Sequence, residues 1–510
     1  MNSNEQCPCS NNAGNVLARI PGVIGTRIGR TPAYGKIGDF VVWHAKKRKE
    51  QIGVFTEMRI IIAGDGKVGS TLTKQLSAEG YDITLVDANP KVLASMEETY
   101  DIMAVQGNCA TMEVLEQAGV GEADLLIAAT SADEINLLCC LTAHGMNKNL
   151  HTIARIRNPE YTDQIVKMRD TFALSLTVNP EKQAAEEIGR LLKYPGFLKR
   201  DTFAKGRVEI VELRVDKNSK LCNQPLSDLD SIIKCKVLVC SVLRNGTAVA
   251  PDGNFVLLEG DRVFVTASSD NLTILLKSLD IITHKVKRVM LCGGGRVSYY
   301  LAKILEKSGI SVQLIERDYD RCVQLSAMLP GVCVVHGDAS SERMLDSEGI
   351  ADCDALVTLT GLDELNMVIS LYGTSCGVPQ IITKVGRVGN SHILNSLSIG
   401  SIVSPKDLCC NTIVRYVRAM KNQTGAALSV HSIADGQMEA VEFKVDKNTR
   451  HIGEPLKTLK TKKNVLIVCI THNSKQEIPS GESFYQVGDT VIVVTSVNKV
   501  IYQLNDIFEE

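Results

Sequence analysis

The 510-residue sequence predicts an α/β protein with two tandem doubly wound parallel sheets, each followed by a small β-rich α+β domain. One observation is an internal repeat, because VELRVDKN at residue 211 returns as VEFKVDKN at residue 441, 230 residues later (441 − 211 = 230). Another is the alternation of short apolar runs with amphipathic helical patterns, which is typical of parallel sheets covered by helices on both faces. The third is a change to an apolar period of two after residue 207, which indicates a separate β-rich domain.

The elements of the first copy follow from their apolar patterns. Six short apolar runs have the length and composition of strands: 59–63, 83–86, 102–105, 125–128, 152–156 and 174–178. Between them, apolar residues recur at three- and four-residue spacing, which predicts helices at 68–79, 111–118 and 134–143. Two further amphipathic segments, 181–192 and 408–420, follow the two sheets and are predicted to be connector helices.

These patterns divide the chain into seven segments. Residues 1–57 lack a periodic apolar pattern, so we expect a disordered or dispensable extension, with a basic arm touching membrane or partner as the alternative. The remaining segments are a sheet domain (58–180), a connector (181–200), a small domain (201–284), a second sheet domain (285–405), a second connector (406–425) and a second small domain (426–510).

Composition excludes several classes of protein. The formal net charge is −2, from 56 basic and 58 acidic residues, so nucleic acid is not expected as a partner. No run approaches the roughly 20 apolar residues of a spanning helix, so we expect no direct membrane insertion. The 16 cysteines include adjacent pairs rather than two CxxC motifs, which predicts free buried thiols and no metal site. Only Cys7 and Cys9 are expected to be exposed.

The segment GDGKVG, which begins at Gly64, lies between an expected strand and an expected helix, the context of a Rossmann-like dinucleotide fingerprint. Gly64 permits the tight turn, Gly66 lets the backbone approach a pyrophosphate, and Gly69 lets the helix pack closely on the sheet. Asp87 ends the next strand, where its carboxylate can accept hydrogen bonds from ribose hydroxyls and repels a 2′-phosphate. The expected cofactor is therefore NAD(H), with ATP or ADP as further candidates. Val68 stands where a P-loop needs Ser or Thr, which excludes that motif.

The second copy carries GGGRVS at the corresponding position, 229 residues later (293 − 64 = 229). Gly293 and Gly295 are kept, Ser298 replaces the third glycine, and Glu316 replaces the aspartate that ends the second strand. Arg317, beside that glutamate, can stack on adenine or tolerate an extra phosphate. We therefore expect a second site whose ligand preference differs from that of the first.

Several segments of the chain resemble the TrkA family, the regulatory subunits of Trk potassium uptake systems: IIIAGDGKVGSTL, TLVDANP, VQGNCATMEVLEQAGVGEADLLIAATSADEINLL and IARIRNP. The resemblance runs from Met58 nearly to the C-terminus, and its most specific parts are the D-E-x-N segments at Asp133 and Asp363 and the paired VDKN strands. It implies potassium-conductance-regulating (RCK) N and C domains in each copy. It also implies a nucleotide-sensing regulatory subunit that gates potassium uptake and is not an enzyme.

The resemblance also implies partners and a place in the cell. The partner would be a potassium-transporting integral membrane subunit, and the chain would form a homo-oligomeric ring, expected as a tetramer. Its location would be cytoplasmic, peripheral on the inner face of the membrane. The connector segments 181–192 and 408–420 would pair the units, with core packing inside one copy as the competing interpretation of their apolar stripes.

The resemblance assigns cofactor-binding positions in both copies. They are Gly64, Asp65, Gly66, Lys67, Val68, Asp87, Thr130, Ser131 and Arg155 in the first, and Gly293, Gly294, Gly295, Arg296, Val297, Glu316, Thr360 and Lys384 in the second. Helix capping is the alternative for each threonine, and Arg155 or Lys384 could offset phosphate charge. The first copy has Asn108 where the second has Asp338, which puts an ionic contact there in doubt.

A dehydrogenase would need a proton-transfer group beside the nicotinamide. The nine histidines show no paired placement; His336, for example, corresponds to Gln106 in the first copy. We therefore predict no catalytic residues. The alternatives are an NAD-dependent oxidoreductase and a stand-alone nucleotide-binding scaffold.

Overall fold

The computed structural model describes residues 58–509, except 194–196, 204–207, 280–284, 387–396, 398, 422–426, 473–474, 497–500 and 502. The expectations for the extension and for Cys7 and Cys9 lie outside these residues. Cys333 corrects the expectation that no other thiol is exposed, because it lies at the solvent surface. It begins an edge strand of its sheet, where one side has no neighbouring strand to cover it.

Two parallel sheets have the same doubly wound order, which confirms the predicted fold class. The first, ordered β3-β2-β1-β4-β5-β6, has strands β1 (Arg59–Ala63), β2 (Asp82–Asp87), β3 (Met103–Gln106), β4 (Leu125–Ala128), β5 (His151–Arg155) and β6 (Leu176–Val178). The second, ordered β14-β13-β12-β15-β16-β17, has strands β12 (Arg288–Cys292), β13 (Ser311–Glu316), β14 (Cys333–His336), β15 (Ala355–Thr358), β16 (Gln380–Lys384) and β17 (Ser401–Val403).

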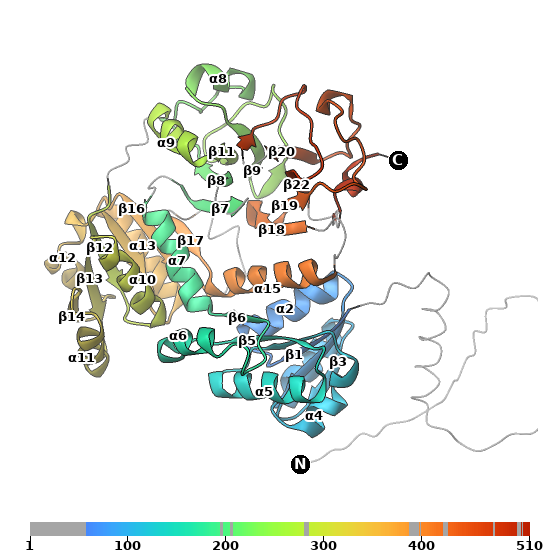
Figure 1. The fold of residues 1–510 in the computed structure, drawn as a ribbon. Coiled ribbons are helices and arrows are strands. Elements are labelled where there is room, and N and C mark those ends of the chain that lie inside the picture. The colour runs from blue at the N-terminus through green and yellow to red at the C-terminus, as the bar shows by residue number, and fades with distance from the viewer. Residues whose placement is uncertain are drawn as a thin grey trace, which may run out of the picture. The chain divides into compact units, whose positions relative to one another are not determined.

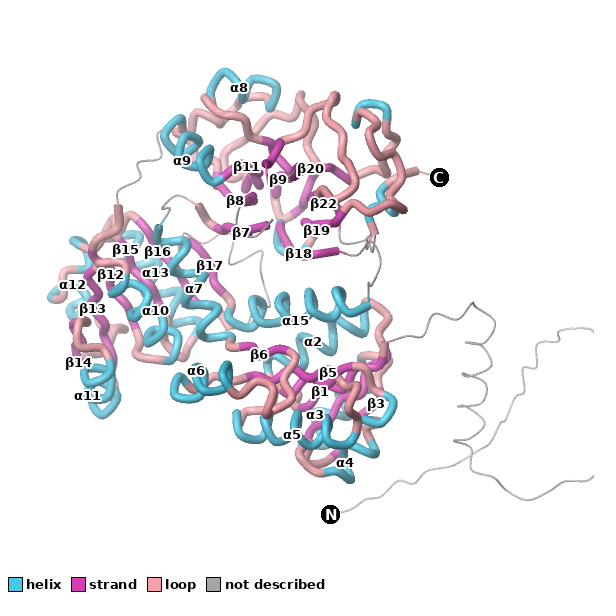
Figure 2. The backbone as a smooth tube through the Cα atoms, in the orientation of Figure 1, coloured by secondary structure: helices cyan, strands magenta, loops and turns pink. Residues whose placement is uncertain are grey.

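Helices cover both faces of the first parallel sheet (Figures 1 and 2). In β1, Ile60 and Ile62 belong to the core formed with α2 (Lys67–Ala78) and α3 (Pro90–Thr99). Ile61 and Ala63 belong to the opposite core, formed with α4 (Met112–Gln117) and α5 (Asp133–Met146). Because both faces are covered, the strand is apolar throughout instead of alternating. The other helices of the two sheet domains are α6 (Pro159–Lys167), α10 (Arg296–Lys307), α11 (Tyr319–Met328), α12 (Glu342–Ser347) and α13 (Asp363–Ser375).

The two connector helices are exchanged between the copies. Helix α7 (Pro180–Lys193) follows the first sheet, but its buried Ile188 and Leu192 belong to the core of the second sheet domain. Helix α15 (Pro405–Lys421) follows the second sheet, and its buried Ile413 and Val417 pack in the core of the first. Arg418 of α15 also binds Glu79, at the end of α2, through two hydrogen bonds of 2.6 and 3.0 Å. The stripes therefore join the copies, and packing inside one copy alone is the wrong interpretation.

Each small domain is built on an antiparallel sheet. The first, ordered β10-β9-β11-β8-β7, has strands β7 (Lys199–Phe203), β8 (Val208–Arg214), β9 (Leu238–Arg244), β10 (Thr247–Val249) and β11 (Arg262–Ser268), with helices α8 (Leu229–Ile232) and α9 (Ser269–Ser278). The second, ordered β18-β19-β22-β20-β21, has strands β18 (Ala427–Ile433), β19 (Met438–Lys444), β20 (Val465–His472), β21 (Lys475–Glu477) and β22 (Thr490–Ser496). The two sheets share one core, which contains Phe264 of the first and Val468 of the second.

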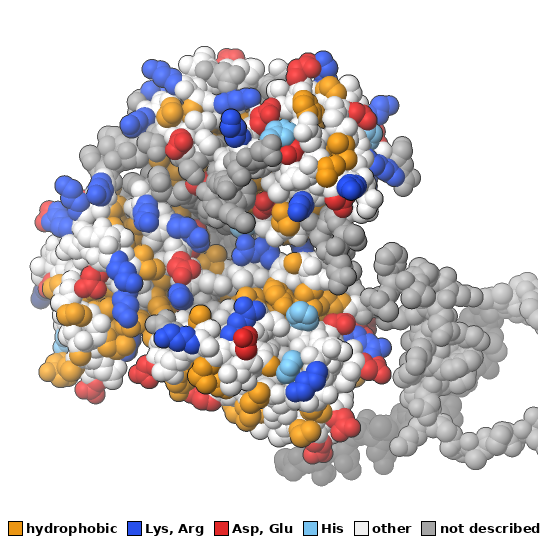
Figure 3. Space-filling view, viewed as in Figure 1, with side chains coloured by type: hydrophobic (Ala, Val, Ile, Leu, Met, Phe, Trp, Pro, Cys, Tyr) orange, Lys and Arg blue, Asp and Glu red, His pale blue; other side chains and the backbone are white. Residues whose placement is uncertain are grey.

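The distribution of charged side chains on the surface agrees with the near-zero net charge of the sequence. Figure 3 shows basic and acidic side chains mixed over the face in view. In the part of the chain that the structure describes, no helix is long and apolar enough to cross a membrane.

Candidate functional site

The first fingerprint loop joins β1 to α2. Gly64 has φ +98°, and a Cβ there would lie 2.8 Å from the Cα of Thr130, so only glycine fits. A Cβ on Gly69 would overlap the carbonyl oxygen of Gly64, which makes the third glycine necessary for close packing of the helix. Gly66 is different, because a Cβ there would meet nothing within 4 Å. The backbone is thus open at Gly66, where the fingerprint expects a pyrophosphate.

The second loop joins β12 to α10 and repeats this geometry. Gly293 has φ +104° and packs against Thr360, and a Cβ on Gly295 would meet nothing within 4 Å. Ser298 replaces the third glycine, is fully buried, and donates its hydroxyl to the carbonyl of Gly293. The hydroxyl therefore finds a partner in the loop itself. Arg296 is exposed beside the opening.

The acidic residues at the ends of the second strands hold these loops. Asp87 accepts hydrogen bonds from the backbone N–H of Asp65 at 2.7 Å and of Asn89 at 2.8 Å. Glu316 accepts from the N–H of Gly294 at 2.5 Å and of Asp318 at 2.8 Å. A carboxylate has about four lone-pair sites, so each can still accept from a ribose hydroxyl.

The two loops differ in charge at the residue that follows the first glycine, which is Asp65 in the first loop and Gly294 in the second. Asp65 has a buried oxygen, Oδ1, without a hydrogen-bond partner among the described residues. Burial, and then the neighbouring charge of Asp87, raises the pKa of Asp65 to about 6. The second copy has Gly294 instead, where a Cβ would lie 2.7 Å from Leu325. Arg321 donates from Nε to the carbonyl of Gly294 at 2.9 Å, so the second loop carries a guanidinium where the first carries a carboxylate.

Beyond β4, Thr130 belongs to a buried network. Asn136, fully buried, accepts from the Thr130 N–H at 2.8 Å and hydroxyl at 2.7 Å, and donates to the carbonyl of Arg155 at 2.8 Å. Arg155 in turn donates to the carbonyl of Thr130. The cap of α5 is Ala132, so helix capping is the wrong interpretation of Thr130.

The same network recurs in the second copy with one substitution. Asn366 accepts from the N–H and hydroxyl of Thr360 at 2.8 and 2.7 Å, and donates to the carbonyl of Lys384 at 3.0 Å. Lys384 Nζ donates to the carbonyl of Thr360 at 2.6 Å. Burial lowers the pKa of Lys384, as it lowers that of Arg155. The cap of α13 is Leu362, so Thr360 is not a helix cap either. Both cations hold backbone carbonyls, which leaves them less available to a phosphate than the sequence suggests.

The D-E-x-N segment supplies residues that sequence reasoning did not place in the site. Asn136 and Asn366 of the two networks come from it, and their recurrence at an offset of 230 (366 − 136 = 230) was the available signal. The buried carboxylate of Asp133 accepts from the N–H of Arg157 at 2.8 Å and of Asn158 at 2.7 Å. The motif thus fixes two loops at the carboxyl edge of the sheet, where ligands of such sheets bind.

The remaining predicted positions have simple environments. The side chains of Val68 and Val297 are buried in the cores, so only their backbone N–H groups could face a ligand. Ser131 is exposed, and its carbonyl accepts from Arg157 Nη2 at 2.5 Å. Asn108 accepts from the N–H two residues ahead at 3.1 Å, and Asp338 makes the same bond at 2.9 Å.

Each fingerprint helix reaches the edge of the other sheet. A Cβ built on Gly386 would lie 3.2 Å from Nζ of Lys67 and 3.4 Å from the carboxylate of Asp363, so the first loop meets the second copy. In the reverse direction, the hydroxyl of Tyr300 in α10 lies 3.1 Å from Asn179 Nδ2 and 3.1 Å from the Thr162 hydroxyl. The two candidate sites are therefore in contact with each other's copies.

No group of three His, Cys, Asp or Glu side chains suited to a metal ion occurs within the described residues. The structure thus contains two loops of matching geometry, each with an open glycine, an acid at the end of the second strand and the same hydrogen-bond network.

Comparisons with known proteins agree with this architecture. The TrkA-N domain model matches residues 60–174 and 289–405, and the TrkA-C domain model matches 210–279. The chain is 30% identical over 460 residues to the Trk system potassium uptake protein TrkA of Haemophilus influenzae, covering 89% of this chain and 99% of that protein. It is 32% identical over 451 residues to a TrkA homolog of Archaeoglobus fulgidus, covering 88% and 100%.

Solved structures show the same fold. The GsuK RCK domain matches with a TM-score of 0.56 and 17% identity, over 89% of this chain and 97% of that one. The GsuK channel bound to NAD matches with a TM-score of 0.55 and 17% identity, over 91% and 82%.

Proposed function

This chain belongs to the TrkA family, and we propose that it is the nucleotide-sensing regulatory subunit of a Trk-type potassium transporter. It binds NAD(H), and ATP or ADP as further ligands, without catalysing a reaction. Its partner is a potassium-transporting integral membrane subunit, on whose cytoplasmic face the chain assembles as a homo-oligomeric ring.

The support for nucleotide binding is the open backbone at the two helix N-termini. Gly66 and Gly295 are the N-cap residues of α2 and α10, and no described side chain caps either helix. The first-turn N–H groups therefore remain free for an anion, and the helix dipole favours negative charge there. The acids Asp87 and Glu316 favour a free ribose 2′-hydroxyl over a 2′-phosphate, which supports NAD(H) rather than NADP(H).

The reciprocal packing of the copies is the observation that carries the regulatory role. A ligand at the start of α2 would contact Lys67, whose Nζ lies beside Gly386 of the other copy, and α2 itself packs against α15. A ligand at the start of α10 would likewise act on a helix whose Tyr300 touches the first copy. Ligands that bind two arrangements of the copies with different affinity would shift their populations, and the ring would transmit that shift to the transporter.

Two measurements on the purified chain test this proposal. Calorimetry with NADH should show binding, whereas NADH absorbance should stay constant with alcohols, hydroxy acids and amino acids as candidate substrates. The chain should also co-purify with the membrane subunit encoded for the same transport system. Substrate-dependent oxidation of NADH that survives further purification would overturn the regulatory proposal in favour of an NAD-dependent oxidoreductase.

A further inference from the structure

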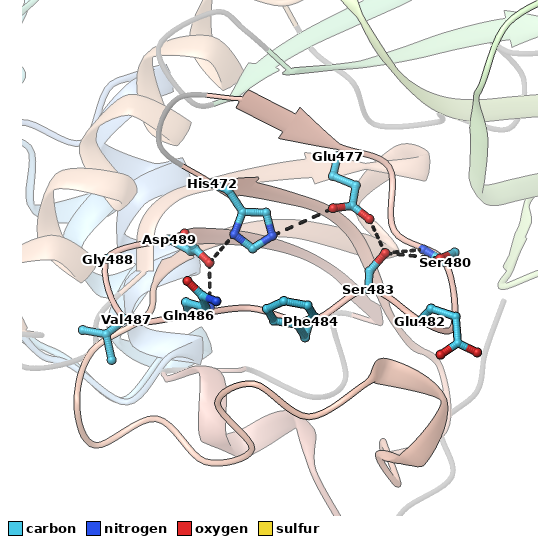
Figure 4. A pocket seen from close by; sticks show the side chains of 10 residues that line it. All are labelled: His472, Glu477, Ser480, Glu482, Ser483, Phe484, Gln486, Val487, Gly488 and Asp489. Carbon is cyan, nitrogen blue, oxygen red and sulfur yellow. Dashed lines mark hydrogen bonds and ion pairs between the residues drawn. The ribbon is translucent and has the colours of Figure 1, made fainter.

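A cavity of about 530 Å³ lies in the second small domain, away from both fingerprint loops. Figure 4 shows its lining, which comes from the end of β20, from β21 and from the segment before β22. This volume lies within the range of small-molecule sites, roughly 300–1,000 Å³. The nucleotide-sensing role does not account for this cavity, and a ligand bound here would be independent of that role.

A chain of polar side chains forms the floor of the cavity (Figure 4). His472 Nδ1 lies 2.7 Å from Asp489 Oδ2, and its Nε2 lies 3.9 Å from Glu477 Oε2. Ser483 donates its hydroxyl to the other oxygen of Glu477 and accepts from the N–H of Ser480 at 2.9 Å. The carboxylates are therefore fixed in orientation before any ligand arrives.

In the first small domain, side chains of the chain itself fill the corresponding place. His472 corresponds to Arg244 and Asp489 to Asp261, both at an offset of 228 (472 − 244 = 228; 489 − 261 = 228), because each pair occupies the same strand positions. Arg244 binds Asp261 through two bonds of 2.8 and 2.6 Å, and its guanidinium lies 4.5 Å from the ring centre of Phe255. A cation and an aromatic ring thus occupy the first domain's version of the site.

The second domain has neither group at the corresponding positions. Phe255 corresponds to Ser483, because each accepts a hydrogen bond from the same position of the repeat. The N–H of Leu226 donates to the carbonyl of Phe255 at 3.0 Å, and the N–H of Leu456 donates to the carbonyl of Ser483 at 2.9 Å. Glu477 takes the place of Val249, at the same offset (477 − 249 = 228), which adds a negative charge. Replacing phenylalanine by serine and arginine by histidine opens the volume and removes the permanent positive charge.

The lining defines the chemistry of the occupant. Three carboxylates, those of Glu477, Glu482 and Asp489, line the cavity, and no Lys or Arg is among the described residues that line it. Glu482 is balanced by Lys457 at 2.5 Å, whereas Glu477 has only the imidazole of His472 nearby among the described ion pairs. Such a lining repels phosphates and nucleotides. Phe484, 39% exposed, offers an aromatic surface to an alkyl chain or a cation.

We infer that this cavity binds a small organic cation, an alkyl ammonium or guanidinium compound. His472 already binds Asp489, as Arg244 binds Asp261, so the cationic head would lie beside His472 against Glu477, the carboxylate that stands where the first domain has Val249. The apolar part of the compound would lie on Phe484. Charge-assisted hydrogen bonds to the oriented carboxylate of Glu477 would supply most of the selectivity.

Titration calorimetry on the full chain with putrescine tests this inference, with 1,4-butanediol as the uncharged ligand of the same length. Putrescine should bind and butanediol should not. Glu477→Gln should weaken putrescine at least about tenfold, because the amide keeps a hydrogen-bond acceptor but not the charge. Glu259→Gln removes an exposed carboxylate from the first domain and should leave binding unchanged.

A second variant keeps the test decisive if the first disturbs folding. The double substitution His472→Arg with Ser483→Phe restores the pair found in the first domain, and should abolish putrescine binding while the melting temperature is maintained. Absence of putrescine binding to the native chain at millimolar concentration would overturn the inference. Equal binding of butanediol, or putrescine binding that both variants retain, would overturn it as well.

Discussion

The two fingerprint loops have nearly the same backbone and different charges. Both have a glycine at positive φ, an open N-cap glycine and an acid that accepts two backbone N–H bonds. The first loop adds the carboxylate of Asp65, whereas the second has Gly294 and the guanidinium of Arg321. The duplication has therefore preserved the shape of the site and changed its electrostatics. We propose that the second site tolerates ligands with more phosphate charge than the first.

The largest expected effect on nucleotide affinity comes from substituting the two N-cap glycines by valine, one at a time. Gly66→Val and Gly295→Val fill space that only a ligand would occupy, and both residues have extended backbone, which valine favours. Each should reduce affinity at its own site by at least about a hundredfold and leave the fold intact. Calorimetry should show the loss of one of two binding events.

Gly121→Val is the matched control, because a Cβ there also meets nothing within 4 Å, but the residue lies in the turn after α4. Loss of both binding events from either loop variant would show that the two sites are not separate.

The exchanged helices offer the next comparison. Arg418 in α15 is buried and binds Glu79 and Glu439, so Arg418→Ala leaves two carboxylates without their cation and should cost about 3 kcal/mol of unfolding free energy. Arg190 in α7 is half exposed, and its ion pair among the described residues is with Glu187 of the same helix. Arg190→Ala should therefore cost less than about 1 kcal/mol. Urea unfolding of both variants would measure the difference. Equal losses of unfolding free energy would contradict the assignment of Arg418 as the residue that joins the two copies.

The acids at the ends of the second strands should show a smaller, site-specific effect. Asp87→Ala and Glu316→Ala remove an acceptor for ribose hydroxyls, and a charge-assisted hydrogen bond is worth roughly 1.5–3 kcal/mol. Affinity should fall about tenfold or more at the first or second site respectively. Calorimetry with NADH and ATP would measure both sites. Unchanged isotherms would mean that these carboxylates serve only the loop N–H groups that they bind in the structure.

The smallest effect concerns Asp65 and depends on pH. Its pKa in the fold, about 6, lies above the ordinary value of 3.8, so the folded state binds the proton more tightly than the unfolded chain. This contribution to stability is present below about pH 4 and is lost as the pH rises through 6. Asp65→Asn should therefore melt at a higher temperature than the native chain at pH 7.5. The gain in free energy of unfolding should be less than about 1 kcal/mol, because solvent screens the site.

At pH 5 the two melting temperatures should nearly coincide, since most of the native carboxyl is protonated there. A difference that does not change between pH 5 and 7.5 would show that the charge of Asp65 is not the cause.

The sequence patterns predicted those structural features that depend only on residues close together in the chain. The strand β1 was predicted at its observed bounds, and the fingerprint glycines were placed correctly, because a strand period and a turn are local properties. The exchange of α7 and α15 stayed open, since an apolar stripe shows that a helix is buried but not against which copy. The raised pKa of Asp65 also depends on a fold-dependent approach to Asp87 that no spacing shows.

Two arrangements of side chains could not be predicted from the sequence for a similar reason. The buried Asn136 network needs residues from three separate segments, so the repeat drew attention to the asparagine without showing its role. The cavity of the second small domain arises from two substitutions, at His472 and Ser483, that meet only after folding.

Nucleotide-dependent regulation is tested most directly by potassium flux through the membrane subunit reconstituted in vesicles with this chain. NADH, NAD and ATP would be added to the native chain and to the Gly66→Val/Gly295→Val double variant, with Gly121→Val as control. We expect nucleotides to change the flux with the native chain and the control, and we expect the double variant to abolish this response while it still binds the transporter. A nucleotide response that persists in the double variant would contradict this expectation.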